Sequence, residues 1–350
     1  MRCLSTVSHG KSFASLTKIF REVPPLRDFR HDLLFSRRSV GLVPTMGALH
    51  EGHLSLVRQA AQENDDVFVS VYVNPTQFGV SEDLDSYPKT WDADVKMLQA
   101  VDRELASTPN AGRVSAIFAP TTKTMYPTLP PSSEIDGQGS FVVITPLDTL
   151  LEGTSRPVFF RGVATVCMKL FNILKPDRVY FGQKDVQQTL VIKRMVKDFH
   201  IDTQVRIGPT KREEDGLALS SRNVYLGERR RRVATVLSEA LMRAEEQFKK
   251  GKRSRGDILW PANDVADQEA RKQGELPPSR RARFEVDYIS LADPDTLEEV
   301  EEVDESRGAI LSGAIKMQPL EEPQEGEDCG LGGGKGTVRL IDNIVLEPKI

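Results

Sequence analysis

The segment of residues 40–57 constrains the fold of this chain more than any other stretch. A short apolar run ends at Pro44, and a turn that contains glycine follows it. Beyond the turn, Leu54, Val57 and Ala61 recur at the spacing of one helix face. The segment therefore predicts a strand, a turn and a helix, which is the repeating unit of proteins built on a parallel sheet.

The start of this predicted helix has the features of a site for nucleotide phosphate. The first turn of a helix carries unpaired N–H groups and the positive end of the helix dipole, and both favour an anion. Gly47 and Gly52 would let a triphosphate approach the backbone closely. His50 and His53 fall on one face of the turn, where both can donate to the same phosphate oxygens. A glycine turn before a helix is about as often a plain connection, so the turn alone does not establish the site.

Metal binding by the two histidines is a weaker interpretation. A protein metal site needs further histidine, cysteine or carboxylate ligands at short spacing. The remaining histidines and all the cysteines are scattered along the chain instead, at His9, His31, His200, Cys3, Cys167 and Cys329. Three scattered cysteines also indicate a reducing compartment without a disulfide framework.

Composition argues against two classes of partner. The chain has 47 basic and 51 acidic residues, a net charge of −4, which gives no electrostatic case for nucleic acid or an anionic membrane surface. No apolar run has the length needed to span a bilayer. We therefore expect partners that are small molecules, with no nucleic acid and no membrane among them.

Residues 1–17 form a leader that we expect to be disordered or non-essential. It contains basic residues and serines, and no acidic residue precedes Glu22. This composition weakly resembles an organellar presequence. The expected location is cytoplasmic, with a mitochondrial location as the alternative.

Strands and helices alternate through the first half of the chain. Dense apolar or β-branched runs predict strands at residues 67–73, 178–181 and 204–208, and helical periodicity covers residues 91–98, 163–174 and the stretch after residue 188. The turn at residues 74–79 directly follows a strand, at the position where open α/β sheets bind ligands. The alternation predicts a doubly wound parallel sheet of the α/β class.

The second half predicts a smaller α+β domain. One face of a long helix, residues 228–250, is apolar, and strands are expected at residues 284–291, 309–317 and 337–346. The arginines at 229–232 could be a nucleic-acid patch, but a solvated helix face is the better interpretation. Four turn-rich stretches are interpreted as loop insertions: residues 103–115, 129–140, 251–282 and 318–336.

Five blocks in order carry a resemblance to the pantothenate synthetase (pantoate–β-alanine ligase) family, within the H-x-G-H nucleotidyltransferase superfamily. They are His50–His53, Val73–Phe78, Tyr180–Gln188, Asp215–Asn223 and Leu340–Asn343. The resemblance extends from about residue 18 to the end and is closest to a eukaryotic, fungal-like member with insertions. It implies a Rossmann-like nucleotide- and pantoate-binding domain at 18–212 and a C-terminal lid domain at 213–350. Gln183 departs from the family, which commonly has Glu there.

The resemblance implies an acid–amine ligase that makes pantothenate for coenzyme A biosynthesis. The carboxylate of (R)-pantoate attacks the α-phosphorus of ATP, giving pantoyl adenylate and pyrophosphate. The amine of β-alanine then attacks the acyl carbon, giving pantothenate and AMP. The nucleophile comes from the substrate, so no Ser-His-Asp group is needed. ATP as substrate, Mg²⁺ with it and a homodimer are implied as well.

Site residues are also implied residue by residue. His53, His50 and Lys184 would be catalytic, and an acid role and a purely electrostatic role for His53 both remain open. ATP would be bound by Met46, Gly47, His50, His53, Gly182, Gln183, Lys184, Asp185, Lys211, Leu219, Ser220, Ser221 and Arg222. Gln77 and Gln188, as uncharged amides, would hold pantoate, with Gln77 also beside β-alanine. Lys211 would meet adenine through its backbone. Mg²⁺ would be held through ATP, with Asp185 as its one candidate protein ligand.

Two other functions compete with this interpretation. One is another nucleotidyltransferase with the same histidine turn, such as a phosphopantetheine adenylyltransferase-like or cytidylyltransferase-like enzyme. The two glutamines and the Ser-Ser-Arg loop argue against it. The other is a catalytically silent nucleotide-binding protein on the same scaffold, and the intact motif residues argue against that.

Overall fold

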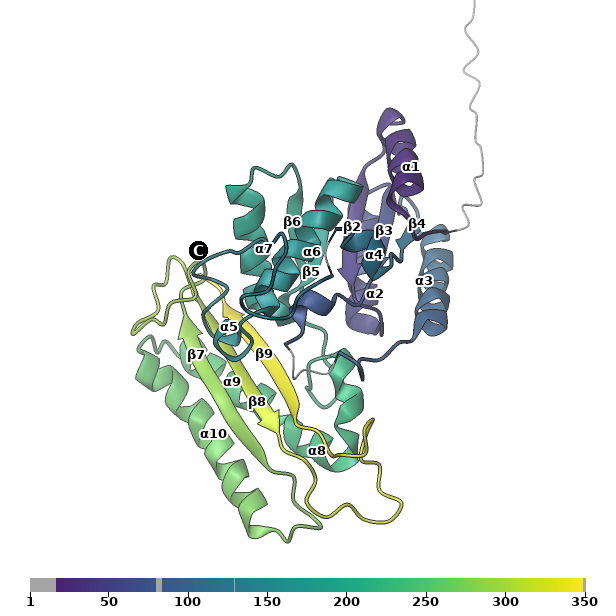
Figure 1. Ribbon diagram of the computed structural model, residues 1–350. Helices are drawn as coiled ribbons and strands as arrows, with labels where there is room; N and C mark the ends of the chain where they lie inside the picture. Colours follow the sequence, from purple (N-terminus) through teal and green to yellow (C-terminus); the bar gives the residue numbers. More distant parts are fainter. Residues whose placement is uncertain (1–16, 80–83, 129, 349–350) are drawn as a thin grey trace, which may run out of the picture.

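Six parallel strands form the larger of two sheets in the computed structural model, which describes residues 17–79, 84–128 and 130–348 (Figure 1). The strands are β1 (Lys18–Phe20), β2 (Val40–Thr45), β3 (Asp66–Val71), β4 (Arg113–Phe118), β5 (Arg178–Gly182) and β6 (Gln204–Gly208). Their order across the sheet is β1-β4-β3-β2-β5-β6, so the direction of winding reverses between β2 and β5. Open α/β sheets bind ligands at such a reversal.

Helices cover both faces of this sheet, which confirms the predicted doubly wound fold. Helices α1 (Val23–Phe35), α6 (Phe159–Leu174) and α7 (Val186–Asp198) pack on one face, and α2 (Glu51–Glu63) and α3 (Trp91–Ala106) pack on the other. Successive strand residues point to opposite faces, so Leu42 joins the first core and Val43 the second. The short helices α4 (Thr122–Met125) and α5 (Glu152–Ser155) lie in the connection from β4 to α6. None of the described helices has both the length and the apolar character needed to cross a membrane.

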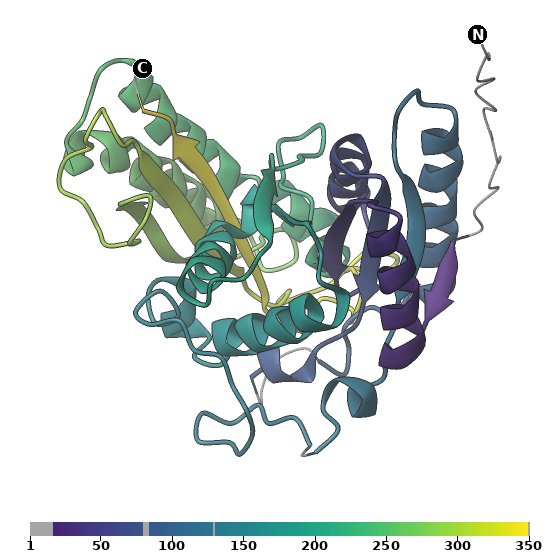
Figure 2. The ribbon, with the colours of Figure 1, turned by 90° about the horizontal axis from the view of Figure 1, so that it is seen from above.

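A three-stranded antiparallel sheet forms the second unit, which Figure 2 shows in green and yellow beside the larger one. Its strands, in order, are β7 (Phe284–Ala292), β8 (Ala309–Met317) and β9 (Val338–Leu346), and its helices are α8 (Gly227–Ala234), α9 (Val236–Lys249) and α10 (Arg255–Glu275). Leu311 and Ile315 of β8 pack in a core with α9 and α10. Ser312 and Lys316 alternate with them and line a cavity between the two units.

Two predicted loops prove to contain regular structure. Residues 251–282 hold α10, whose start is capped because Ser254 Oγ accepts from the Asp257 N–H (3.2 Å). Glycine, Pro261 and many charges hide its periodicity, but Ile258 and Ala262 are buried at helical spacing. The loop predicted at residues 103–115 is shorter than we expected and covers residues 107–112, because α3 continues to Ala106 and β4 begins at Arg113.

The interpretation of residues 229–232 as a solvated helix face was wrong for two of the four arginines. Arg229 and Arg230 are 5% and 1% exposed. Arg229 Nε donates to Glu327 Oε1 (2.7 Å), and Arg230 Nη1 donates to the Gly336 carbonyl (2.7 Å). The segment 318–336 has no helix or strand, and these two side chains hold it against α8. The predicted single helix at 228–250 is two helices, α8 and α9, with Thr235 between them.

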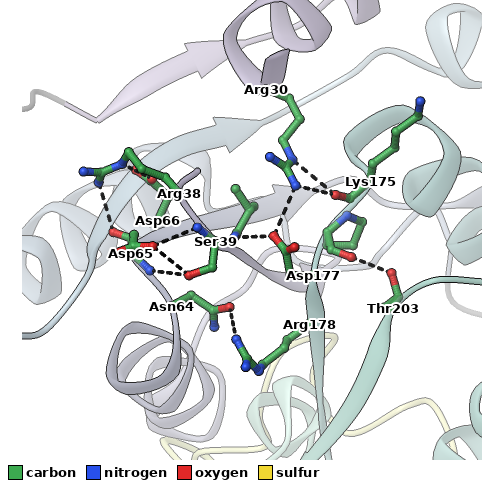
Figure 3. A network of polar contacts seen from close by, with 12 residues as sticks. Arg30, Arg38, Ser39, Asn64, Asp65, Asp66, Lys175, Asp177, Arg178 and Thr203 are labelled. Atoms are coloured by element: carbon green, nitrogen blue, oxygen red, sulfur yellow. Dashed lines mark hydrogen bonds and ion pairs between the residues drawn. The ribbon is translucent and has the colours of Figure 1, made fainter. Parts of the chain in front are cut away.

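Polar side chains fix the amino-terminal ends of the central strands (Figure 3). Asp177 accepts from the Val40 N–H (2.7 Å) and from Arg30 Nη2 (3.1 Å), which joins the start of β2 to the turn before β5. Asp65 accepts from the Ser39 N–H (2.8 Å), which joins the segment before β2 to the segment before β3. These bonds lie at the amino-terminal ends of the strands, and ligands are expected at the opposite, carboxyl ends.

Helix α6 comes unusually close to the 3₁₀ turn η1 (Pro75–Gln77). Gly162 makes the approach possible, because a Cβ there would overlap the Thr76 carbonyl group and the Gln77 nitrogen. Both contacts are with backbone, which cannot turn away as a side chain can. Gly162 therefore couples the packing of α6 to the position of Gln77.

We expect Gly162→Ala to lower the free energy of unfolding by about 1–3 kcal/mol, the usual cost of forcing a methyl group into a packed site. Urea-induced unfolding followed by circular dichroism measures this. Gly274→Ala is the matched control, because Gly274 also lies in a helix but has open space where the Cβ would be. Equal stability of Gly162→Ala and the unaltered protein would contradict the proposed close contact.

Candidate active site

Two adjoining cavities open at the carboxyl ends of β2 and β5. The smaller has a volume of about 220 Å³ and contains both histidines of the predicted turn. The larger, about 980 Å³, extends between the two units to β8 and β9. Residues that line both cavities are Phe159, Lys184, Asp185, Gln188, Ser220 and Arg222. The two cavities therefore form one continuous cleft at the place where the sheet order reverses.

The two histidines cap the helix that follows them. His50 is the N-cap residue of α2, and its Nδ1 accepts from the Gly52 N–H (3.2 Å). His53 Nδ1 accepts in turn from the His50 N–H (3.4 Å), and the ring centroids lie 4.1 Å apart. Because Nδ1 is an acceptor in each ring, the proton of each neutral imidazole is on Nε2. The first-turn N–H groups that we expected to be free for phosphate are thus partly used by the rings, and the Nε2–H groups become the donors.

Burial keeps both imidazoles neutral. Burial, together with the smaller effect of the nearby Lys184 ammonium, lowers the pKa of His50 to about 4. Burial lowers the pKa of His53 to about 3, with added effects of His50 and Lys184. Near pH 7 the pair can donate hydrogen bonds to an anion but carries no charge of its own.

Both glycines of the turn have a packing role that we did not predict, and Gly52 also lines the smaller cavity. A Cβ at Gly52 would lie 2.9 Å from Nδ1 and Cε1 of His50, so Gly52 makes room for the ring that caps the helix. Gly47 has φ +84°, and a Cβ there would lie 3.0 Å from Asp94 Oδ2. Gly47 lines neither cavity, so the structure places it behind the site.

Asp94 is a supporting residue that sequence reasoning missed. It is 2% exposed, and its carboxylate accepts from the backbone N–H groups of Ala48 (3.0 Å) and Leu49 (2.9 Å). These bonds hold the turn that leads into His50. A signal was present, since Asp94 is an acid on the same helix stripe as Leu98.

Lys184 reaches the cleft from the 3₁₀ turn η2 (Gln183–Asp185), directly after β5 and Gly182. Its Nζ lies 3.7 Å from Asp185 Oδ1, and both residues line both cavities. Gln183 lines neither, and its Nε2 donates to Asn343 Oδ1 (3.4 Å) on β9. Of the predicted ATP residues, Gly47 and Gln183 therefore lie outside the cavity walls.

The Ser-Ser-Arg loop lies against the histidine turn. It forms the 3₁₀ turn η3 (Ser221–Tyr225), in which Ser220 Oγ accepts from the Arg222 N–H (3.2 Å). Ser221 Oγ donates to the Ala48 carbonyl (3.1 Å), across 173 residues of sequence. The other predicted nucleotide residues on the wall of the smaller cavity are Met46, Gly182, Lys211 and Leu219.

The predicted glutamines border the smaller cavity as well. Gln77 is 7% exposed and lines this cavity, and its Oε1 accepts from Asn74 Nδ2 (3.1 Å). Asn74 also donates to the Gly162 carbonyl (3.1 Å), a support that we did not predict. Gln188 lines both cavities, whereas its neighbour Gln187 is buried and donates to backbone carbonyls.

Arg156 is a further cation at the site that the sequence did not single out. Its guanidinium lies 3.7 Å from the centroid of the Phe159 ring, and Nη2 donates to the Gln77 carbonyl (3.4 Å). Nothing in the local sequence distinguishes it from other surface arginines.

The charges of the smaller cavity suit an anion. Within the described part of the chain its wall carries three cationic side chains, Lys184, Lys211 and Arg222, and one acidic side chain, Asp185. Residues 17–79, 84–128 and 130–348 contain no group of three or more histidine, cysteine or acidic side chains that could hold a metal ion. A polyanion held by cations and neutral imidazole donors is the ligand that this wall fits.

We expect acid to destabilise the protein through the two histidines. As pH falls below 6.5, the unfolded chain binds protons that the folded chain excludes, so stability is lost from about pH 6.5 down to about pH 4 through His50 and down to about pH 3 through His53. The loss is at most about 1.4 kcal/mol per pH unit for each ring. The double variant His50→Asn, His53→Gln keeps capping groups without titrating rings and should show a shallower loss in urea unfolding. An unchanged slope would contradict the lowered pKa values.

Comparison with known proteins agrees with the site geometry. Residues 18–345 match the family model described as pantoate-beta-alanine ligase. The chain is 43% identical over 328 residues to the pantothenate synthetase of Roseiflexus castenholzii, covering 93% of this chain and 99% of that protein. It is 46% identical over 310 residues to the pantothenate synthetase of Roseiflexus sp. strain RS-1, covering 88% and 93%.

Solved structures agree with the sequence relatives. Pantothenate synthetase from Thermus thermophilus superposes with a TM-score of 0.73 at 36% identity, covering 95% of this chain and all of that one. Pantoate-beta-alanine ligase from Francisella tularensis, crystallised with beta-gamma ATP and beta-alanine, gives a TM-score of 0.66 at 29% identity, covering 94% and 98%. Since the family model and the relatives agree over nearly the whole chain, the chain belongs to the pantoate–β-alanine ligase family.

Proposed function

We propose that this chain condenses (R)-pantoate with β-alanine at the expense of ATP, through a pantoyl-adenylate intermediate. Membership of the family supports the reaction, and the F. tularensis relative has been crystallised with an ATP compound and β-alanine. The observation that carries the proposal is the smaller cavity, where three cations and two neutral imidazole donors lie beside the uncharged amides of Gln77 and Gln188. The rival assignment to a phosphopantetheine adenylyltransferase-like enzyme is not favoured by these relatives.

In the first step a carboxylate oxygen of pantoate forms a bond to the α-phosphorus of ATP. The bond from that phosphorus to the bridging oxygen breaks, and pyrophosphate leaves with the electron pair. Pantoate is already ionised at neutral pH, so the chain needs no base for this step. Its task is to stabilise the charge that moves onto phosphate oxygens, and the cavity wall offers Lys184, Arg222 and the two histidines for this.

In the second step the neutral amine of β-alanine attacks the acyl carbon and AMP leaves with the electron pair of the broken C–O bond. The amine loses its proton as the amide forms. Uncharged amides at Gln77 and Gln188 can orient pantoate without pairing its carboxylate to a fixed cation. That arrangement keeps the carboxylate nucleophilic in the first step and leaves the acyl carbon accessible to the β-alanine amine in the second.

Of the two roles left open for His53, we propose the electrostatic one. In the protein without nucleotide the pKa of His53 is lowered to about 3, so near pH 7 its ring is neutral and holds no extra proton to give as a charged acid. A neutral Nε2–H held in place by the His50 N–H can still donate to a developing negative charge.

We propose that Mg²⁺ accompanies ATP. The ion prefers phosphate and carboxylate oxygens and keeps several waters, so one protein carboxylate is enough. Asp185 fits that limited task, because its side chain is 43% exposed and lines both cavities. The ion would neutralise part of the triphosphate charge when bound.

Other proposals rest on the sequence alone. They are a homodimer, a cytoplasmic location with mitochondria as the alternative, a eukaryotic and fungal-like origin, and the division at residue 212 into two domains. The relatives named above are bacterial proteins and do not bear on origin. The leader on which the mitochondrial alternative depends lies almost wholly in residues 1–16, outside the described residues.

Omission of each substrate in turn tests the proposed reaction. We expect AMP to form only when ATP, pantoate and β-alanine are all present, and pyrophosphate to be released in a single turnover when β-alanine is left out. A coupled assay for each product measures this. ATP binding without pyrophosphate release in the presence of pantoate would support the silent binding protein instead.

We expect His53→Ala to slow adenylate formation by on the order of a hundredfold, the size typical of losing one preorganised donor. Pyrophosphate release with pantoate and ATP measures the rate. His31→Ala is the control, because His31 is exposed on α1, and it should leave the rate unchanged. Near-normal turnover in a folded His53→Ala protein would falsify the proposed role.

A further inference from the structure

Strand β9 of the small sheet reaches across the cleft to the turn that carries Lys184. It is the strand of that sheet nearest to the larger unit (Figures 1 and 2). Asn343 on β9 is 2% exposed, and its Nδ2 donates to the carbonyls of Gln183 and Lys184, each at 2.8 Å. Two successive carbonyl acceptors require an amide NH₂, so the orientation of the Asn343 side chain follows from its partners.

We propose that Asn343 is a positioning residue that holds Lys184 in place for adenylate formation. This inference rests on the proposed role of Lys184 as a phosphate-binding cation. Asn343 does not act on the substrate in this proposal. It acts through the backbone of η2, whose two carbonyls it fixes.

The turn that carries Lys184 has little support of its own. It is a single 3₁₀ turn of three residues, and no side chain caps its start. Gly182 precedes it, and a Cβ at Gly182 would have no neighbour within 4 Å. The backbone of such a short turn has conformational freedom of its own, and the lysine side chain moves with it. The two bonds from Asn343 remove part of that freedom before any substrate binds.

Asn343 is itself held firmly by its neighbour. Asp342 is 4% exposed, and its Oδ1 accepts from the Asn343 N–H (2.8 Å). The same carboxylate pairs with two guanidinium nitrogens of Arg212, the residue after Lys211. Through adjacent residues, β9 thus contacts the two loops that bring Lys184 and Lys211 to the smaller cavity.

A rate measured in two backgrounds separates positioning from general stability. We expect Asn343→Ala to slow pyrophosphate release with pantoate and ATP by about tenfold to a hundredfold, because small displacements of a catalytic group cost that much. In the Lys184→Ala background the same substitution should change the rate less than about twofold, since there is no ammonium left to position. The KM for pantoate should stay nearly unchanged.

An equal factor in both backgrounds, or no effect of Asn343→Ala in either, would overturn the inference. A normal rate in Lys184→Ala alone would instead overturn the proposed role of Lys184, so the two failures can be told apart. Should Asn343→Ala fail to fold, Asn343→Ser keeps one donor and is taken through the same comparison, with an intermediate loss expected. If Asn343→Ser slows the rate by the same factor with and without Lys184→Ala, the inference is also refuted.

Ser290→Ala is the matched control. Ser290, Ser312 and Asn343 lie in register across β7, β8 and β9, so their side chains share one face of the small sheet. Ser290 is 1% exposed, lines neither cavity, and has no hydrogen-bond partner for its hydroxyl among the described residues. We expect Ser290→Ala to leave the rate of pyrophosphate release unchanged, and a loss of about tenfold there would show that any change on this face slows the enzyme.

Discussion

The capping of α2 by its own two histidines determines how the rest of the site is arranged. Each ring uses Nδ1 to satisfy a backbone N–H at the start of the helix, which fixes the ring and leaves Nε2–H as the donor. Two neutral imidazoles therefore stand between the positive end of the helix and the cleft, and their Nε2–H groups are the donors available there. Asp94 behind the turn and Ser221 in front of it hold the backbone that makes this capping possible.

Polar groups at the amino-terminal ends of the parallel strands differ in purpose from those at the carboxyl ends. At the amino-terminal ends of the strands, Arg30 and Asp177 pair with each other, and Arg30, Asp177 and Asp65 each bind a backbone group, which holds the strand starts in place (Figure 3). At the carboxyl ends of the strands, Lys184 and Arg222 line the smaller cavity. Because the strand starts are fixed, the strand ends hold their positions, and the loops beyond them can carry chemistry without also holding the sheet together.

Periodicity and short motifs predicted what depends on local sequence. The strands β6 and β8 have the predicted bounds, and nearly every predicted nucleotide residue lies on a cavity wall. What the sequence hid depends on partners far along the chain. Arg229 and Arg230 are buried only because the segment 318–336 folds onto them. Asn343 belonged to a recognised block, but its contact with η2, about 160 residues away, has no local signature.

The reaction itself explains why the site combines cations with so many neutral groups. Fixed cations throughout the cavity would bind the triphosphate well but would also pair with the carboxylate of pantoate and weaken it as a nucleophile. Two cations on loops, Lys184 and Arg222, share the smaller cavity with the carboxamides of Gln77 and Gln188 and with the neutral rings at the helix start, so one wall offers groups for both demands. Such a mixed wall works only if the few cations are well positioned. The hydrogen bonds from Asn343 on β9 to the turn that carries Lys184 provide such positioning from the other side of the cleft.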